Sequence, residues 1–332
     1  MKDFNIVFLG GSITQGAGAS KYENSFVCKV SEYIKELHKD KNINILNSGI
    51  GGTGSEFGLF RLKRDVIDKR ADLVFIEFAV NDRIVNSQLA SITTEGIVRE
   101  LSKCVNPPAV AFLITPTGLG DACSSVHKRV AYYYNVPCID IQDYVYKDIG
   151  MDVYTWEEIS IDNLHPNDKG HEIYAECIIN EVSANINILE NKPIIKNSAI
   201  NKYKFKKPQI ISYEKAIFYG HWREENINMP GKIELAAVTD NVGDCLEVYF
   251  KGKYFSITTL LSKESGALDI DIDGIGFYSD LYANSDPYFT CGIKIMNLNE
   301  GEHKATLRLS QKRNPQSIGN RIVIGGFLVE DY

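Results

Sequence analysis

The sequence predicts an α/β domain built on a parallel sheet, followed by an all-β domain. In the first part of the chain, short apolar runs alternate with stretches whose apolar residues recur at helical spacing, as strands and helices do when they alternate. From about residue 208 on, the pattern changes to short alternating runs separated by turn residues. The length of 332 residues also exceeds what one ordinary domain needs. We therefore predict domains at residues 1–190 and 208–332, joined by a lysine- and asparagine-rich linker over 191–207.

The expected strands and helices of the first domain follow one another in regular alternation. The strands are expected at residues 4–9, 43–46, 72–78, 109–114 and 136–139. The helices are expected at residues 22–38, 56–69, 89–103, 122–134 and from about 166 to 189. The third strand is nearly all apolar, as a strand buried on both faces should be. This alternation predicts a parallel sheet with helices on both faces.

Composition and charge exclude several classes of protein. Hydrophobic residues make up 44% and charged residues 24% of the chain, which is typical of a globular protein. A net charge of -7 argues against a nucleic-acid partner, and no apolar run approaches the roughly 18 residues that a membrane helix needs. No signal peptide is recognisable after Met1, so we expect a cytoplasmic protein, or a secreted one if a leader has been removed. Seven scattered cysteines indicate reduced thiols and no metal site.

The first strand ends in Gly10-Gly11-Ser12, which makes Ser12 a candidate nucleophile. Glycines permit a sharp turn, and open α/β sheets bind their ligands at the carboxyl ends of strands. The same motif also fits a helix cap or a phosphate-binding loop. A serine nucleophile needs a base, a group that orients the base, and donors for the oxyanion.

Three further segments offer these groups. Asp162 and His165 lie three residues apart before the last helix, so the carboxylate can accept the Nδ1 proton while Nε2 acts as a base. Gly52 lies in the glycine-rich loop after the second strand, where backbone amides can point at a ligand. Asn81 follows the third strand and could donate from its side chain. Each segment alone also has a structural interpretation, as a connector or as a turn cap.

In this order the motifs resemble those of the SGNH hydrolases, the GDSL esterase/lipase superfamily. Ser12 stands in place of the family's Gly-Asp-Ser serine, and Gly52 matches the glycine of its second block. Asn81 matches the Gly-x-Asn-Asp block, and the pair Asp162-x-x-His165 matches the last block. The resemblance covers about residues 4–189.

Two positions depart from the family pattern. Gly11 replaces the aspartate of the first block, and Ala79 replaces the glycine before the asparagine. Neither position handles a proton or the oxyanion, so we expect the chemistry to survive both changes.

The resemblance implies a flavodoxin-like three-layer α/β/α domain that acts as a serine esterase without a metal or a cofactor. Ser12 would attack the ester, with His165 as the base and Asp162 as its orienting group. The amides of Ser12 and Gly52 and the side chain of Asn81 would form the oxyanion hole. The second domain is predicted to be a jelly-roll-type β-sandwich, similar to the accessory domains of carbohydrate esterases. We therefore expect hydrolysis of O-acyl esters, above all O-acetyl esters on a carbohydrate, with a small-molecule or oligosaccharide ester as the substrate.

Other interpretations remain open at this point. A lipase or thioesterase for longer acyl chains would need an apolar groove, and the segments around the motifs contain no long apolar loop. A glycan-binding protein without significant catalysis would have no need of the complete motif set.

Trp156 is a candidate wall of the substrate pocket. Residues 269–274 imitate a calcium loop, but strands flank them, so no metal is expected. The sequence does not determine the oligomeric state.

Overall fold

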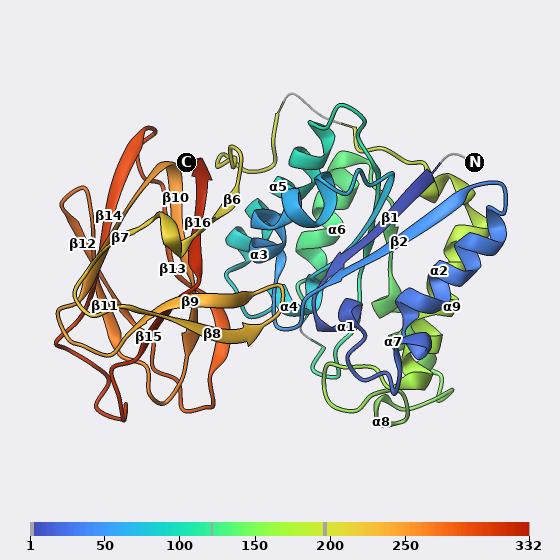
Figure 1. Cartoon of the computed structure of the whole chain (residues 1–332). Helices are drawn as coiled ribbons and strands as arrows, with labels where there is room; N and C mark the ends of the chain where they lie inside the picture. The colour runs from blue at the N-terminus through green and yellow to red at the C-terminus, as the bar shows by residue number, and fades with distance from the viewer. Residues whose placement is uncertain (1–2, 121, 195–197, 332) are drawn as a thin grey trace. The chain divides into compact units, whose positions relative to one another are not determined.

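The computed structural model describes residues 3–120, 122–194 and 198–331. The chain forms two compact units, Met1–Lys204 and Phe205–Tyr332, and both are drawn in Figure 1. The first unit is α/β and the second is antiparallel all-β, so the predicted fold class is confirmed. The boundary between the units falls inside the segment 191–207.

A five-stranded parallel sheet forms the centre of the first unit. Its strands are β1 (Asp3–Gly10), β2 (Asn42–Gly49), β3 (Leu73–Glu77), β4 (Ala109–Leu113) and β5 (Cys138–Ile139). They lie in the order β2-β1-β3-β4-β5, and every residue of β3 and β4 is buried. From β1 the chain adds β2 on one side and β3 to β5 on the other, so the strand order reverses between β1 and β3. In such a sheet, ligands bind in the crevice at the carboxyl ends of these two strands.

Helices cover both faces of this sheet (Figure 1). One face carries α2 (Phe26–Leu37), α7 (Ile141–Gly150) and α9 (Asp168–Ala184). The other face carries α3 (Ser55–Phe60), α5 (Ser87–Ser102) and α6 (Ser124–Tyr134). The stacked rings of Phe8 and Phe75, 4.8 Å apart, join β1 to β3 within the core.

Local capping explains why the first long helix is shorter than its expected range. The helix expected at 22–38 begins only at Phe26, because Ser25 is extended and its side chain accepts a hydrogen bond from the Cys28 amide. A 3₁₀ turn precedes it at Tyr22–Asn24. Other departures are a π-helical turn at Lys63–Ile67, a 3₁₀ turn at Ile186–Leu189, and the unexpected helices α7 and α8 (Trp156–Ile159).

The second unit contains one large and one small antiparallel sheet. Its strands are β6 (Gln209–Ser212), β7 (Ile217–Tyr219), β8 (Arg223–Met229), β9 (Ile233–Thr239), β10 (Cys245–Leu261), β11 (Ala267–Ile272), β12 (Ile275–Asp280), β13 (Tyr288–Met296), β14 (Glu302–Leu309), β15 (Ile322–Ile324) and β16 (Gly326–Asp331). The large sheet follows the path β12-β11-β14-β10-β16-β6, with β7 and β13 also paired to β10, and the small sheet is β15-β9-β8. The pairing of β10 with β16 has a register shift between Lys251 and Phe255. The aspartate-rich segment forms β11 and its turn into β12, where the Asp273 carboxylate contacts His303 Nδ1 at 2.6 Å.

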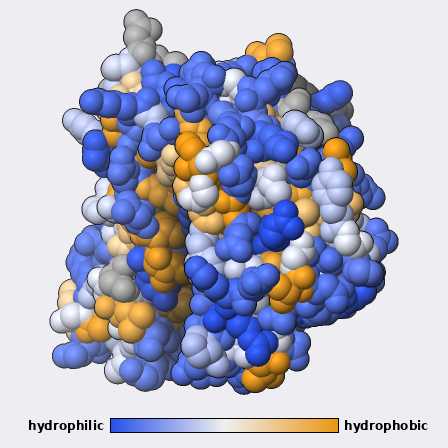
Figure 2. Space-filling model, turned by 90° about the vertical axis from the view of Figure 1, so that its left-hand side faces the viewer, coloured by the Kyte–Doolittle hydropathy of each residue, from blue (hydrophilic) through white to orange (hydrophobic). Residues whose placement is uncertain are grey.

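Figure 2 shows a face of the molecule on which hydrophilic residues predominate and hydrophobic ones form limited patches. Among the described residues, no helix is both long enough and apolar enough to cross a membrane.

Candidate active site

Ser12, His165 and Asp162 form a continuous chain of hydrogen bonds. Ser12 opens the one-turn helix α1 (Ser12–Gln15) directly after β1. Its Oγ lies 2.9 Å from Nε2 of His165, which is 153 positions away in the sequence. The other ring nitrogen, Nδ1, lies 2.8 Å from Asp162 Oδ2. The three residues predicted from the sequence motifs are therefore brought together in the order that a serine nucleophile needs.

The Asp162 carboxylate is held by the backbone of its own loop. Its second oxygen, Oδ1, accepts hydrogen bonds from the amides of Leu164 at 2.6 Å and His165 at 2.7 Å. Partial burial alone would raise the pKa of Asp162, but hydrogen bonds from the His165 ring and from the two amides lower the pKa below its usual value. An ionised carboxylate at Nδ1 keeps the proton on that nitrogen, which leaves Nε2 to accept the Ser12 proton.

Trp156 packs against the loop that carries Asp162 and His165. Its indole Nε1 donates a hydrogen bond to the Asp162 carbonyl at 2.8 Å. A β-carbon on Gly118 would lie only 2.5 Å from this nitrogen, so the tryptophan lies directly against Gly118. Ser160 Oγ ties the loop further by donating to the His165 carbonyl at 2.9 Å. Trp156 thus borders the triad, and its role as a pocket wall stays a prediction.

Asn81 and Gly52 lie beside the turn that carries Ser12. Asn81 belongs to the one-turn helix α4 (Ala79–Asp82) after β3. A β-carbon on Gly11 would come within 2.1 Å of Asn81 Oδ1, so Gly11 makes room for the asparagine side chain. A β-carbon on Gly51 would lie 3.5 Å from Ser12 Cβ. The next residue, Gly52, has a φ of +69°, a left-handed conformation that favours glycine.

A buried carboxylate contacts the turn that carries Ser12, and the sequence motifs do not reveal it. Glu77 ends β3 and is 1% exposed. Its two oxygens accept hydrogen bonds from Thr14 Oγ1 and Thr115 Oγ1, each at 2.9 Å. It also accepts a bond from the Gly11 amide, while burial raises the pKa of the glutamate. Its only sequence signal is an acid that interrupts the apolar run 73–78.

A buried aspartate–histidine pair holds the helix that carries Asn81. Asp82 Oδ2 lies 2.9 Å from His127 Nε2, and both side chains are buried. Asp82 Oδ1 accepts a hydrogen bond from the Ser55 amide at 2.9 Å. The pair therefore connects α4 to α6 and to the first residue of α3.

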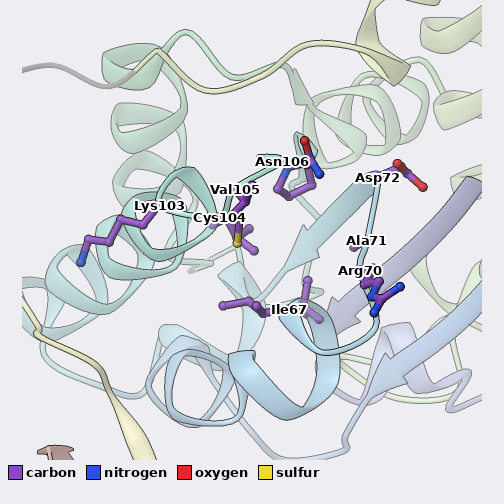
Figure 3. Close-up of a pocket in the computed structure, with 11 residues that line it drawn as sticks. Ile67, Arg70, Ala71, Asp72, Lys103, Cys104, Val105 and Asn106 are labelled. Carbon is purple, nitrogen blue, oxygen red and sulfur yellow. The ribbon is translucent and has the colours of Figure 1, made fainter.

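A cavity of about 500 Å³ lies near the amino ends of the strands, at the opposite end of the sheet from Ser12 (Figure 3). Its lining comes from the segments that precede β3 and β4, including Ile67, Arg70, Cys104 and Val105. These segments adjoin the amino ends of the strands, whereas Ser12 follows a carboxyl end. The cavity is therefore separate from the triad.

Comparison with known proteins identifies the family. Residues 8–173 match the GDSL-like Lipase/Acylhydrolase family. The chain belongs to this family. The resemblance noted in the sequence is thereby confirmed, and this GDSL-family hydrolase is an esterase or acylhydrolase that acts on carboxylic esters.

Solved structures resemble this GDSL-family hydrolase along nearly its whole length. Two structures of a two-domain esterase active on acetylated mannans, one co-crystallized with mannopentaose, each align with 99% of this chain. The mannopentaose complex has a TM-score of 0.86 and 24% identity, with 91% of its chain covered. The other has a TM-score of 0.84 and 25% identity, with 92% covered.

A relative of known sequence matches a shorter part. An uncharacterized lipoprotein of Bacillus subtilis (strain 168), YqeF, is 33% identical over 94 residues, which are 28% of this chain. The match spans 35% of the length of that relative.

Proposed function

We propose that this chain is a serine esterase that removes O-acetyl groups from a carbohydrate through an acyl-enzyme on Ser12. The observation that carries the proposal is the relay from Ser12 Oγ to His165 Nε2 at 2.9 Å and from His165 Nδ1 to Asp162 Oδ2 at 2.8 Å. A glycan-binding protein has no need of such a relay.

In the first half-reaction, Ser12 attacks the ester carbonyl. His165 Nε2 takes the Ser12 proton as the new C–O bond forms, and Asp162 stabilises the imidazolium that results. The tetrahedral oxyanion is held by the amides of Ser12 and Gly52 and by the Asn81 side-chain amide. When the intermediate collapses, the ester C–O bond breaks and His165 protonates the leaving alcohol.

In the second half-reaction, water releases the acyl group. His165 Nε2 removes a proton from the water as its oxygen attacks the acyl carbon, and the same oxyanion donors hold the charge. Collapse breaks the bond to Ser12 Oγ, which recovers its proton from His165. Each oxyanion donor is expected to contribute on the order of 10²–10³ to turnover.

The choice of an acetylated carbohydrate as substrate draws support from the two-domain relative. That esterase is active on acetylated mannans, and the structure at 25% identity aligns with 99% of this chain, including both units. We propose accordingly that residues 1–190 are the hydrolase domain and residues 208–332 an accessory β domain for an oligosaccharide substrate.

Two measurements test this proposal. Purified protein should release acetate from acetylated manno-oligosaccharides, and it should hydrolyse p-nitrophenyl acetate severalfold faster than the octanoate ester. Faster hydrolysis of the octanoate would favour a lipase or thioesterase. Ser12→Ala should lose turnover while it keeps its fold. Oligosaccharide binding without any acetate release by the wild type would favour the glycan-binding alternative.

A further inference from the structure

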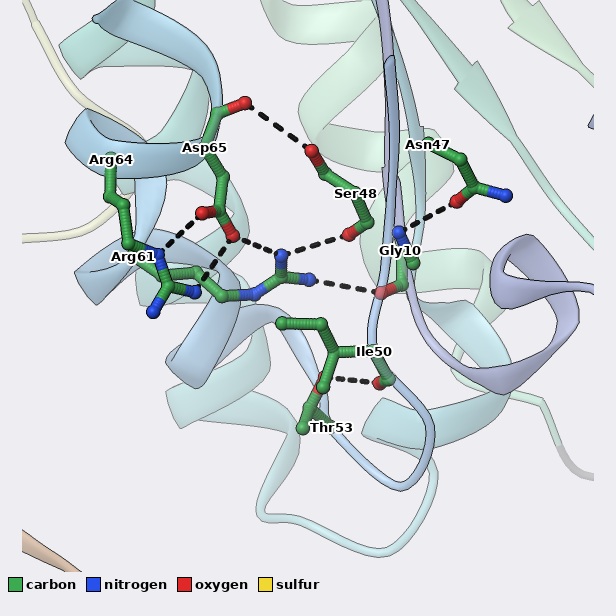
Figure 4. A network of polar contacts seen from close by, with 9 residues as sticks. Gly10, Asn47, Ser48, Ile50, Thr53, Arg61, Arg64 and Asp65 are labelled. Carbon is green, nitrogen blue, oxygen red and sulfur yellow. Dashed lines mark hydrogen bonds and ion pairs between the residues drawn. The ribbon is translucent and has the colours of Figure 1, made fainter. Parts of the chain in front are cut away.

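A fully buried arginine contacts the carboxyl ends of β1 and β2, which lead into Ser12 and into the loop that carries Gly52. Arg61 follows α3 and is 1% exposed. Its Nη2 donates to the Gly10 carbonyl at 3.0 Å, and its Nη1 donates to the Ser48 carbonyl at 2.8 Å. Nη1 also contacts Asp65 Oδ2 at 2.6 Å. Figure 4 shows the guanidinium pointing from the helix side toward the ends of β1 and β2.

The Gly10 carbonyl is the point at which the two functional loops meet. It accepts a hydrogen bond from the Ile50 amide at 3.0 Å in addition to the one from Arg61. Gly10 precedes Ser12 by two positions, and Ile50 precedes Gly52 by two positions. Thr53 Oγ1 closes the second loop by donating to the Ile50 carbonyl at 2.7 Å (Figure 4). The guanidinium therefore holds the Gly10 carbonyl, and a small shift of this carbonyl would change the spacing between Ser12 and Gly52.

Fold stability alone does not explain a guanidinium at this position. Burial lowers the pKa of Arg61 to about 10, so the side chain stays charged at neutral pH, and a buried charge carries a large desolvation penalty. Asp65 offsets part of this penalty: burial would raise its pKa, but hydrogen bonds from Arg64 and Arg61 and the Arg61 charge lower it. The guanidinium also lies over the rings of Phe57 and Phe78, at 5.8 and 5.9 Å. Well-packed apolar residues at such sites are often equally or more stabilising.

We propose that Arg61 is a positioning residue for the esterase reaction, which sets the spacing between the nucleophile Ser12 and the oxyanion donor Gly52. This inference rests on the proposed function of the site. The planar guanidinium donates to two carbonyls and a carboxylate at once, which a lysine ammonium on a flexible stem cannot reproduce in the same plane. Its loss should reduce kcat and leave KM nearly unchanged, because the substrate would still bind beside a less well-aligned site.

The test compares Arg61→Met and Arg61→Lys with the control Arg64→Met. Arg64 contacts the same Asp65 carboxylate at 2.5 Å, but its side chain is 53% exposed. We measure kcat and KM with p-nitrophenyl acetate, the labelling rate of Ser12 by a fluorophosphonate, and the melting temperature. Rates are normalised to the amount of protein that the fluorophosphonate finally labels, so a loss of folded protein alone does not lower them.

Both Arg61 variants should lose roughly 10- to 100-fold in normalised kcat, with KM within about threefold of wild type. Arg64→Met should retain wild-type values. If Arg61→Met does not fold, Arg61→Lys decides, because it keeps the buried charge. Wild-type kcat and labelling rate in a folded Arg61 variant would overturn the inference, as would an equal loss in Arg64→Met. Absence of labelling at Ser12 in the wild type would instead contradict the proposed function.

Discussion

Gly11 offers a test of the proposed oxyanion hole, because the absence of a side chain at this position leaves room for Asn81. A β-carbon on Gly11 would lie 2.1 Å from Asn81 Oδ1, whereas the nearest backbone atom, the Thr53 carbonyl oxygen, lies at 3.4 Å. The new β-carbon in Gly11→Ala would therefore clash with the end of the Asn81 side chain, and the backbone should stay almost in place. The asparagine amide should rotate away, while the Ser12–His165 contact of 2.9 Å stays intact.

The magnitude follows from the loss of one donor. Removal of one oxyanion-hole donor costs about 10²–10³ in kcat, which corresponds to roughly 3–4 kcal/mol in the activation free energy. Gly11→Ala and Asn81→Ala should each show a loss of this size. The double variant should lose no more than either single variant, because both substitutions remove the same donor.

The assay is steady-state hydrolysis of p-nitrophenyl acetate, with a melting curve for each variant. Gly150→Ala is the matched control, since a β-carbon there would meet no atom within 4 Å. It should keep wild-type kcat, and Gly11→Ala should keep a melting temperature close to wild type. Wild-type kcat in Gly11→Ala, or additive losses in the double variant, would refute the assigned role of Asn81.

Three further predictions concern the loop that carries Asp162. Asp162→Asn should lower kcat by on the order of 10²–10⁴, because an amide no longer holds the required His165 tautomer; a loss below this range would count against the orienting role. Since hydrogen bonds lower the Asp162 pKa, its stabilisation is present above the unfolded value of about 3.9 and is lost as the pH falls through the lower folded value. The melting temperature of Asp162→Asn should therefore depend less on pH in this acid range than that of wild type, and parallel profiles would contradict this. Trp156→Phe should keep a ring against Gly118 but lose the 2.8 Å bond to the Asp162 carbonyl, which should lower kcat by roughly three- to tenfold; an unchanged kcat would limit Trp156 to packing.

Local patterns sufficed to predict the strands of the first unit and to single out the members of the candidate triad. Ser12 follows an apolar strand through two glycines, and the Asp162–His165 spacing lies in a loop before a helix. These features depend on neighbouring residues, so they can be recognised without the tertiary structure. The start of α2 was also available in principle, because Ser25 is a typical N-cap residue.

The supporting residues could not be derived in the same way. Arg61 and Glu77 are each 1% exposed, and their partners come from other strands and helices. Their function depends on which carbonyls and hydroxyls the fold brings near them, which sequence spacing does not encode. In the second unit, β8 alternates little in apolar character and owes its place to pairing with β9.

In the proposed mechanism, Ser12 carries the acyl group during turnover. Acid quenching of the wild type during hydrolysis of p-nitrophenyl acetate, followed by peptide mass spectrometry, tests this directly. We predict an acetyl group on the peptide that contains Ser12, and none on that peptide in Ser12→Ala. Wild-type turnover by Ser12→Ala, or an acetyl group trapped on a different residue, would rule out Ser12 as the nucleophile.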